Sequence, residues 1–538
     1  MALPGMAMER ARRAGPAGVP GLAIVGFALA VTLAKALVPP WTPDALYYHL
    51  TLPRLYLEAG GFVKLPFEPI VSGYPGLTQM LFTVALAWGR DELAAVFSWM
   101  HLPLLLLASA WLTSIARGPG DRSGGSGGPF VAMLALASIP QLLHVSSVPL
   151  VEGSTALFVT VGLGSAVRAG QLGSVRWTVA CSLALGMACS TKYLAAPACV
   201  AILVGVGAAL ARTRGARCAV PTLSAATLAI VLVFLPWGLK NQRDWGSPVF
   251  PFHRPAGTPA AVADLVRTHT RDFAANAQAA PLWWLPFDLT FNARPDDMQA
   301  YQGEVGPLLL ALLPLPLFLG RSRNPATARA LGGLALLLFL VWSGFSRQVR
   351  FLFPLVPPLV AWCLARPPDD DRPLPLVLVA VLGLILGVGW YVAFTRPVHD
   401  LPYLAGRESR ASYYRTLAPT ASLFLAFETL RREPADSRVI FFWEYRRYLC
   451  PRSFVPDYGY ILLELPHDPD RALARLRQAG VTHLLFNRSL FLEERATGYR
   501  WPFETTFEAM VRRPGVVPIF AALGPGRQEI YLFRLARR

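Results

Sequence analysis

A succession of long apolar runs constrains this chain more than any other feature of its sequence. Hydrophobic residues make up 54% of the 538 positions and charged residues only 15%, a balance too apolar for an ordinary soluble enzyme. Because a membrane-spanning helix needs about 20 mostly apolar residues, we predict a mostly α-helical transmembrane bundle of about eleven spans, within a range of about 10–13. The predicted spans are 21–40, 93–116, 130–147, 153–167, 177–191, 194–211, 219–237, 306–320, 330–345, 351–365 and 373–394. The shorter run 76–89 is expected to lie beside the membrane or to re-enter it.

Arginines mark every second loop between these runs, and they also precede the first run. The positive-inside rule places such loops in the cytoplasm. We therefore expect a cytoplasmic N-terminus, with the loops 41–92 and 238–305 and the tail 395–538 outside. The same rule accounts for the net charge of +17, so nucleic acid is not an expected partner. A signal peptide over residues 1–36 is an open alternative, and its cleavage would leave the loop 41–92 on the outer side.

The tail has a different pattern from the rest of the chain. From about residue 435, strand-like runs (RVIFFWEYR, VTHLLFN, EIYLFRL) alternate with the helical stretch DPDRALARLRQAG. This pattern predicts a small extracytoplasmic α/β domain. The expected division is a transmembrane domain over 1–394 and a C-terminal domain over 395–538.

Two acidic residues lie on the predicted outer side, next to apolar runs. Insertion of these runs into a membrane gives no reason for an acid at either position. Asp44 follows the first run in PDALYYHLTLPRLYLEAGG, beside Tyr48 and His49, and Glu152 lies between two runs in SSVPLVEGSTALF. Ionisable groups at membrane depth, or just outside it, are candidates for function. The structural alternative is that each acid only stabilises the N-terminus of a helix.

Basic residues accumulate on the same side. Lys192 lies in GMACSTKYLAAP, Lys240 in PWGLKNQRDWGSPVFPF, and Arg347 and Arg350 lie in SRQVRFLFP. The two arginines are three residues apart and share one helical face, which suits bidentate phosphate binding. The alternative is that these side chains extend to lipid phosphates at the membrane surface.

The order of these motifs resembles the GT-C superfamily of polytopic glycosyltransferases, in the branch of bacterial family 39. Protein O-mannosyltransferases, aminoarabinose transferases and oligosaccharyltransferases belong to the same superfamily. The resemblance covers roughly residues 20–400 and rests on PDALYYHLTLPRLYLEAGG, GMACSTKYLAAP, PWGLKNQRDWGSPVFPF and SRQVRFLFPLVPPL.

The resemblance implies a role for each candidate residue. Asp44 occupies the position of the catalytic base, and Glu152 that of a supporting acid or possible metal ligand, where Asp is more usual. Lys192, Lys240, Arg347 and Arg350 match positions that bind the donor phosphate. Related enzymes often carry two adjacent acids in the first loop, but Ala45 follows Asp44 here, so a divalent cation stays an open alternative.

The implied reaction moves a sugar from a polyprenyl-phosphate donor to an extracytoplasmic lipid, glycan or protein, with inversion of the anomeric centre. Asp44 would act as general base, fixed cations would stabilise the leaving phosphate, and Tyr48 or His49 could orient the acceptor. The enzyme would be a multi-pass protein of the inner (plasma) membrane, with its active site facing the periplasm or exterior. A flippase or transporter of lipid-linked sugars, and an outer-face glycan polymerase or ligase, are the alternatives.

Overall fold

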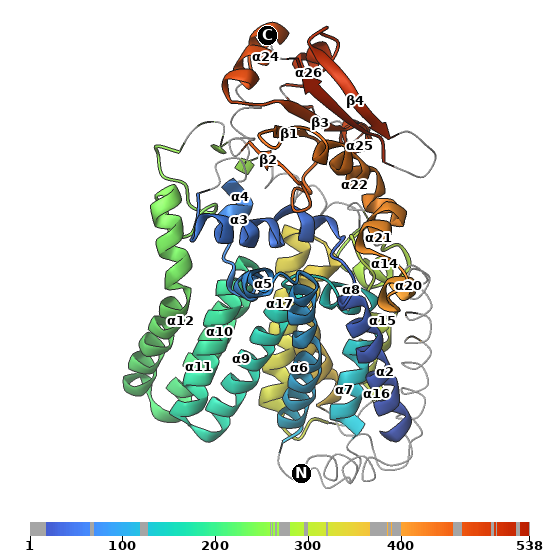
Figure 1. The fold of residues 1–538 in the computed structure, drawn as a ribbon. Helices are drawn as coiled ribbons and strands as arrows, with labels where there is room; N and C mark the ends of the chain where they lie inside the picture. The colour runs from blue at the N-terminus through green and yellow to red at the C-terminus, as the bar shows by residue number, and fades with distance from the viewer. Residues whose placement is uncertain are drawn as a thin grey trace.

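A computed structural model describes residues 18–64, 69–118, 127–258, 260, 262–263, 266–267, 280–294, 300–318, 321–365, 385, 389, 400–455, 465–496, 500–501, 503–522 and 528–536. Within these ranges the chain is mostly helical, and a five-stranded sheet lies near the C-terminal end. Figure 1 shows the sheet at the opposite end of the molecule from the N-terminal helix α2. The predicted span 373–394 falls outside the described residues, apart from Ile385 and Gly389.

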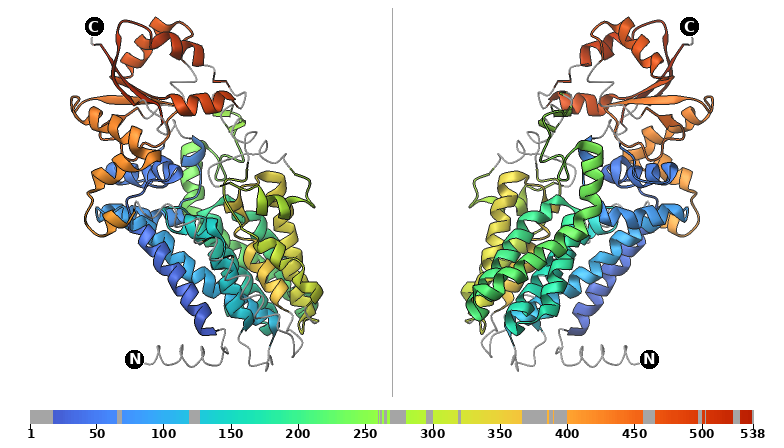
Figure 2. Two further views of the ribbon diagram at one scale, coloured as in Figure 1. Left: turned by 90° about the vertical axis from the view of Figure 1, so that its right-hand side faces the viewer. Right: turned by 90° about the vertical axis from the view of Figure 1, so that its left-hand side faces the viewer.

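The body of the molecule is a layer of long helices that run side by side (Figures 1 and 2). Four described helices are long and apolar enough to cross a membrane, or five if the bent pair α7–α8 forms one span. The protein is thus a multi-pass membrane protein, although these helices do not confirm a count of about eleven. The elements of this part are α2 (Gly18–Ala36), α5 (Leu77–Ala87), α6 (Glu92–Arg117), α7 (Gly127–Ala137), α8 (Pro140–Ser146), α9 (Glu152–Leu172), α10 (Val175–Thr191), η2 (Tyr193–Ala195), α11 (Ala196–Arg214), α12 (Ala216–Trp245), α14 (Leu285–Phe291), α15 (Leu308–Leu312), α16 (Leu315–Phe318), α17 (Pro325–Phe345), η3 (Val349–Leu352) and α18 (Val356–Leu364).

Prolines interrupt three of the predicted spans. The run 130–147 bends by 73° between α7 and α8, where Pro140 begins the second helix. Pro314 separates α15 from α16, and Pro354 separates η3 from α18. Proline has no backbone N–H and disfavours a helical conformation in the residue before it. Among the described residues, none of these three runs is one continuous helix, and their assignment as membrane spans stays a prediction.

Small residues let the central helices pack closely. A Cβ atom on Gly162 of α9 would lie 2.6 Å from Leu185 of α10, and one on Gly164 would lie 2.2 Å from Trp111 of α6. Close approach at small residues is typical of helix contacts in membranes. By contrast, α12 lies at the edge of the layer (Figure 1) and exposes leucines and valines along its length, as expected of a helix that faces lipid.

The tail contains the sheet and several short helices. Parallel β2 (Ser453–Phe454), β1 (Arg438–Phe442) and β3 (His483–Asn487) are followed by antiparallel β5 (Ile530–Leu535) and β4 (Val516–Ala522), in the spatial order β2-β1-β3-β5-β4. The helices are α20 (Asp400–Leu404), α21 (Arg410–Thr416), α22 (Ala418–Arg431), α24 (Pro469–Gln478), α25 (Arg488–Ala496) and α26 (Glu504–Met510). The three predicted strands and the predicted helix are confirmed as β1, β3, β5 and α24.

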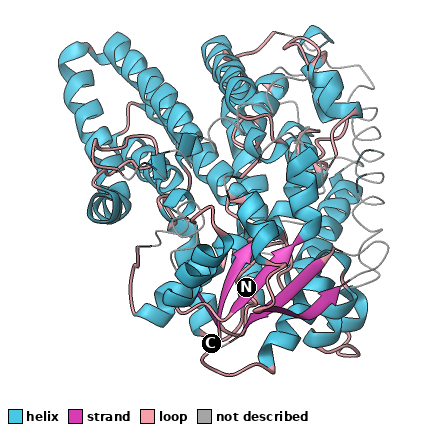
Figure 3. Cartoon of the chain, turned by 90° about the horizontal axis from the view of Figure 1, so that it is seen from above, coloured by secondary structure: helices cyan, strands magenta, loops and turns pink. Residues whose placement is uncertain are grey.

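Both faces of this sheet are covered. Along β1, Val439 and Phe441 belong to one hydrophobic core with residues of α22, whereas Ile440 and Phe442 belong to another with residues of α24 and α26. This alternation follows from the two-residue period of a strand. Figure 3, a view from above, shows the sheet lying over the ends of the body helices. The tail therefore has cores of its own and stands over one end of the helical layer.

Candidate active site

Asp44 stands at the start of an unusual turn. Residues Ala45–His49 form a π-helix, η1, in which Leu50 N–H donates to the carbonyl of Ala45, and α3 (Thr51–Ala59) follows. Short π-helical segments are rare and are frequent at functional sites. The Asp44 side chain makes no capping hydrogen bond to this turn. Helix capping therefore does not account for the acid.

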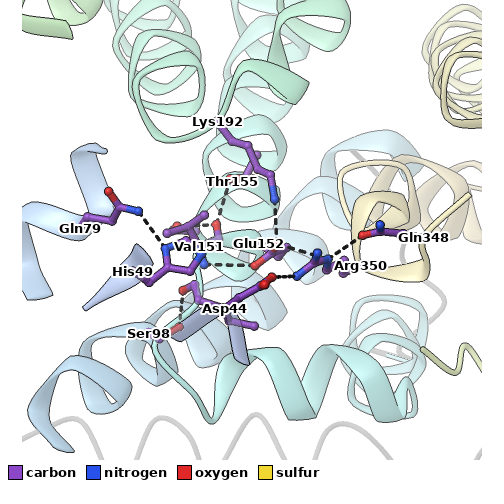
Figure 4. A network of polar contacts seen from close by, with 12 residues as sticks. Asp44, His49, Gln79, Ser98, Val151, Glu152, Thr155, Lys192, Gln348 and Arg350 are labelled. Carbon is purple, nitrogen blue, oxygen red and sulfur yellow. Dashed lines mark hydrogen bonds and ion pairs between the residues drawn. The ribbon is translucent and has the colours of Figure 1, made fainter. Parts of the chain in front are cut away.

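Four of the predicted charged residues meet in one cluster (Figure 4). The Asp44 carboxylate pairs with the guanidinium of Arg350, and Lys192 Nζ lies 2.7 Å from Glu152 Oε1. Arg350 Nε lies 3.9 Å from the same Glu152 oxygen and so links the two pairs. The result is a compact group of two acids and two bases, contributed by four segments that are far apart in the sequence.

Asp44, Glu152 and Lys192 each stand at the end of a helix, and Arg350 lies within the short helix η3. Glu152 is the first residue of α9, is 3% exposed, and accepts a hydrogen bond from Val151 N–H at 3.1 Å. Lys192 follows α10 in an extended conformation, and its ammonium lies 4.3 Å from the centre of the Phe351 ring. A carboxylate at a helix N-terminus is stabilised by the helix dipole, so local structure favours a charged Glu152.

His49 lies beside the two acids and is almost fully buried. Gln79 Nε2 and His49 Nδ1 are 2.9 Å apart. This contact occupies Nδ1, and its direction depends on the tautomer of the ring. His49 Nε2 is buried without a hydrogen-bond partner among the described residues, which leaves one ring nitrogen for a ligand. The Tyr48 ring packs against His49, with centroids 4.0 Å apart.

Burial and charge set the protonation of these groups. Burial lowers the pKa of His49 to about 4, although Glu152 and Asp44 act in the opposite direction, so the ring is neutral near pH 7. Burial alone would raise the pKa of Asp44, but the charge and hydrogen bond of Arg350 hold that pKa below its ordinary value. Asp44 is therefore a carboxylate throughout the physiological range.

The other two predicted phosphate ligands lie in different surroundings. Lys240 Nζ donates to the Ser72 carbonyl at 2.5 Å and lies 3.3 Å from Asp244. Arg347 donates to the Ala280 carbonyl at 2.7 Å and to a carbonyl of α17 at 3.2 Å. Lys240 also contacts Asn241 Oδ1 at 3.5 Å, and Arg347 forms a side-chain hydrogen bond with Tyr301, so the partners of both residues lie outside the cluster. Their role in phosphate binding stays a prediction.

Two neutral residues of the site escaped the sequence analysis. Gln79 holds His49, and Gln348 accepts from Arg350 Nε at 2.9 Å. Gln348 Nε2 is also buried without a partner among the described residues. Gln79 is a polar residue inside the apolar run 76–89, and this contrast was the available signal for it. Gln348 lies between the two predicted arginines, but it carries no charge, so the pattern of charged residues does not mark it.

A divalent cation does not fit the donors that the structure offers. In the described part of the chain, no three His, Cys, Asp or Glu side chains come together as metal ligands. Asp44 and Glu152 each have a basic partner, and positive charge beside these acids opposes a cation. No step of the chemistry considered below uses a metal.

Comparison with known proteins identifies the fold. No family model matches the sequence, and no curated protein matches it. The structure is similar to ArnT from Cupriavidus metallidurans bound to undecaprenyl phosphate, with a TM-score of 0.56, 15% identity, and coverage of 96% of this chain and 97% of ArnT. ArnT in the apo state also gives a TM-score of 0.56 at 15% identity, covering 95% of this chain and 97% of that one.

The archaeal oligosaccharyltransferase AglB from Archaeoglobus fulgidus, in complex with an inhibitory peptide and a dolichol-phosphate, aligns at a TM-score of 0.49 and 12% identity. That alignment covers 95% of this chain and 74% of AglB. The chain therefore shares the fold of ArnT, and the fold expected from the resemblance is confirmed. At these identities the likeness concerns the fold, and the chemistry has to be argued from the site.

Proposed function

We propose that this protein is a membrane glycosyltransferase that moves a sugar from a polyprenyl-phosphate donor to an extracytoplasmic lipid, glycan or protein. The observation that carries the proposal is the cluster in which Asp44 and Glu152 face Arg350 and Lys192, contributed by four segments. The similarity to ArnT bound to undecaprenyl phosphate supports a donor of this class. The active site would face the periplasm or exterior of the inner membrane.

The donor phosphate would bind to Lys192 and Arg350. Both cations are partly exposed, with 22% and 14% of their side-chain surface accessible, so a ligand can reach them. The phosphodiester of such a donor carries one negative charge, as a carboxylate does, and its two free oxygens offer bidentate acceptor geometry to an arginine. It would therefore compete with Asp44 for Arg350, and its binding would free the Asp44 carboxylate.

The freed carboxylate would act as general base. In a single displacement, an acceptor oxygen or nitrogen forms a bond to the anomeric carbon while the bond from that carbon to the phosphate oxygen breaks. The acceptor proton passes to Asp44, and polyprenyl phosphate leaves with the bonding electron pair. Lys192 and Arg350 stabilise the charge that develops on the phosphate. The anomeric configuration inverts.

Glu152 and the neutral groups would support this step. Glu152 holds Lys192 at 2.7 Å, which keeps the ammonium charged and in place beside the phosphate. His49 Nε2 and Gln348 Nε2 have no hydrogen-bond partner among the described residues, so both can bind the substrate. We propose that His49 and Tyr48 orient the acceptor. Arg347 remains a proposed phosphate ligand. Lys240 is buried beside Asp244, and we propose that it stabilises the fold instead of binding the phosphate.

Residues 395–538 are proposed to form a separate extracytoplasmic domain that binds the acceptor or covers the site. The sheet and its two cores support separate folding of this part. Its position above the ends of the body helices (Figure 2) supports a role next to the active site.

Substitution of Asp44 by Asn tests the proposal most directly. Purified protein in vesicles would be given a labelled polyprenyl-phosphate sugar, and both transfer and movement of the donor across the bilayer would be measured. A transferase loses transfer in the variant, whereas a flippase keeps donor movement. Asp470→Asn is the matched control, because this acid is exposed and pairs with Arg513 in the tail. Transfer by Asp44→Asn at the control rate would contradict the mechanism.

A further inference from the structure

The tail contacts the segment that carries Asp44 on both sides of that residue. Before it, the Tyr414 hydroxyl donates to the Pro40 carbonyl at 2.9 Å. After it, the backbone N–H of Tyr448 donates to the Leu46 carbonyl at 3.0 Å. Tyr414 is 1% exposed and Leu46 is fully buried, so both bonds lie away from water, where they are strongest.

A third contact follows on α3. Arg54 Nη1 donates to the carbonyl of Tyr448 at 2.8 Å and to that of Cys450 at 3.2 Å, both in the loop after β1. The Arg54 Nε atom also pairs with Glu58 on its own helix at 2.7 Å. The tail thus holds the segment at three points: residues 40, 46 and 54.

The tail is itself fixed to the helical body close to this segment. Arg410 of α21 pairs with Asp91 and with Glu92, the latter at 3.1 Å, at the start of α6. The Tyr448 hydroxyl donates to Asp91 at 3.0 Å, so one residue contacts both the Asp44 segment and the body. These contacts join the tail to the start of α6.

The turn that bears Asp44 depends on such outside contacts. A helical segment of five residues is too short to be stable by itself, and π-helical geometry is rarely favoured. The Leu46 carbonyl within the turn accepts both from Tyr448 N–H and from the Thr51 hydroxyl, the latter at 2.9 Å. The tail therefore supplies a hydrogen bond to the turn from outside it.

We infer that the tail holds the η1 turn in the conformation that presents Asp44 to Arg350, with Arg54, Tyr414 and Tyr448 as positioning residues. The catalytic consequence rests on the proposed function of Asp44. None of the three acts on the reacting atoms. They set where the Asp44 carboxylate stands, and an error of about 1 Å in such a position can lower a rate by about a hundredfold.

Two variants test the inference, each with a matched control. Tyr414→Phe removes one buried hydroxyl, and Tyr413→Phe is its control because the neighbouring hydroxyl of Tyr413 bonds to Asp400 within the tail. Arg54→Ala removes the two bonds to the tail loop, and Glu58→Ala is its control because it removes only the exposed pair on α3. Transfer kinetics and hydrogen–deuterium exchange of residues 38–54 would be measured on the full chain in vesicles.

Both test variants should exchange faster over residues 38–54 than their controls, while the β1 and β3 strands keep wild-type protection. Their kcat should fall by about tenfold while the KM for the donor changes by less than about twofold, because the phosphate ligands stay in place. Arg54→Lys should recover part of the loss. Wild-type exchange and kcat in both test variants would overturn the inference. If the wild-type protein transfers no sugar but both test variants exchange faster than their controls, the inference that the tail holds the η1 turn stands. The proposed function is then overturned.

Discussion

Two acid–base networks in the molecule differ in their exposure. One is open to a ligand, as a binding site must be, whereas the acid and the lysine of the other are buried within the fold. In the first, Asp44, Arg350, Glu152 and Lys192 come from four segments, and Asp44 keeps 29% of its side-chain surface exposed. In the second, Lys240 and Asp244 lie four residues apart on α12, and each is only 2% exposed. A ligand can reach the first network. In the second, Lys240 and Asp244 are closed to solvent, Lys240 donates to a backbone carbonyl, and the exposed Arg243 pairs with Asp244 from outside.

Both networks include buried polar atoms without a hydrogen-bond partner in the described part of the chain, among them Asp244 Oδ2 and Trp245 Nε1 at the second. Around the first network, His49 Nε2 and Gln348 Nε2 are buried without a hydrogen-bond partner in the described part of the chain. Around the second, Asn241 donates to the carbonyl of Gly73 at 2.7 Å and to the Tyr193 hydroxyl at 3.1 Å. Buried polar groups are costly without partners, so unpartnered polar atoms beside partly exposed charges indicate a place for substrate. The following predictions test this contrast, from the largest expected effect to the smallest.

Asp44→Asn should abolish transfer while expression and donor binding stay near wild type. An amide cannot take the acceptor proton, and loss of a general base typically lowers a rate by about 10²–10⁴-fold. Single-turnover transfer with a labelled donor measures the loss, and a separate binding assay confirms that the donor still binds. If the variant binds the donor and transfers sugar normally, Asp44 is not the general base. The first network would then have only a structural role, like the second.

Lys240→Ala should destabilise the protein without changing its dependence on donor concentration. The substitution removes the buried partner of Asp244 and leaves this acid paired only with the exposed Arg243, whose Nε lies 2.8 Å away. The loss should therefore stay below the roughly 3–5 kcal/mol that a fully broken buried pair costs. Thermal unfolding in detergent would show the loss, and Lys240→Met, which fills the space, should leave a similar loss because the acid remains. A raised KM for the donor at normal stability would place Lys240 among the phosphate ligands, and the contrast between the networks would fail.

Arg350→Ala should weaken use of the donor more than use of the acceptor, and Lys192→Ala should act in the same direction. Loss of a charge-assisted hydrogen bond to phosphate costs roughly 1.5–3 kcal/mol. Steady-state kinetics with each substrate varied in turn separate the two effects. If the dependence on donor concentration is unchanged in both variants, Arg350 and Lys192 do not bind the donor and instead contact lipid headgroups.

His49 should make the folded protein less stable in mild acid. Its folded pKa of about 4 lies below the ordinary value of 6.5, so between these values the unfolded chain binds a proton that the folded chain excludes. This stability is complete above about pH 6.5 and decreases toward about pH 4, by roughly 2 kcal/mol at about pH 5. Melting temperatures at these pH values should fall less in His49→Gln than in wild type. An equal fall in both proteins would mean that His49 is not buried in its neutral form.

Several features could be predicted from the sequence because they follow from local costs. A charged residue beside an apolar run is expensive unless something uses or pairs it, and this cost singled out Asp44, Glu152, Lys192 and Arg350. Alternation of apolar residues predicted three strands of the tail, since a strand has a period of two residues. The spacing of Lys240 and Asp244 would also have predicted their pairing, because residues four apart share one face of a helix.

Other features were decided by the path of the chain through space. Asp44 meets Arg350 across 306 positions of sequence, and nothing local to either residue specifies the other. Gln79 and Gln348 carry no charge, so their cost of burial is small and only their neighbours reveal their use. The bend at Pro140 and the hold of the tail on the Asp44 segment are likewise outcomes of packing. Hydrophobic period and charge are properties of neighbouring residues, whereas the partner of a buried group depends on which distant segments the fold brings to it.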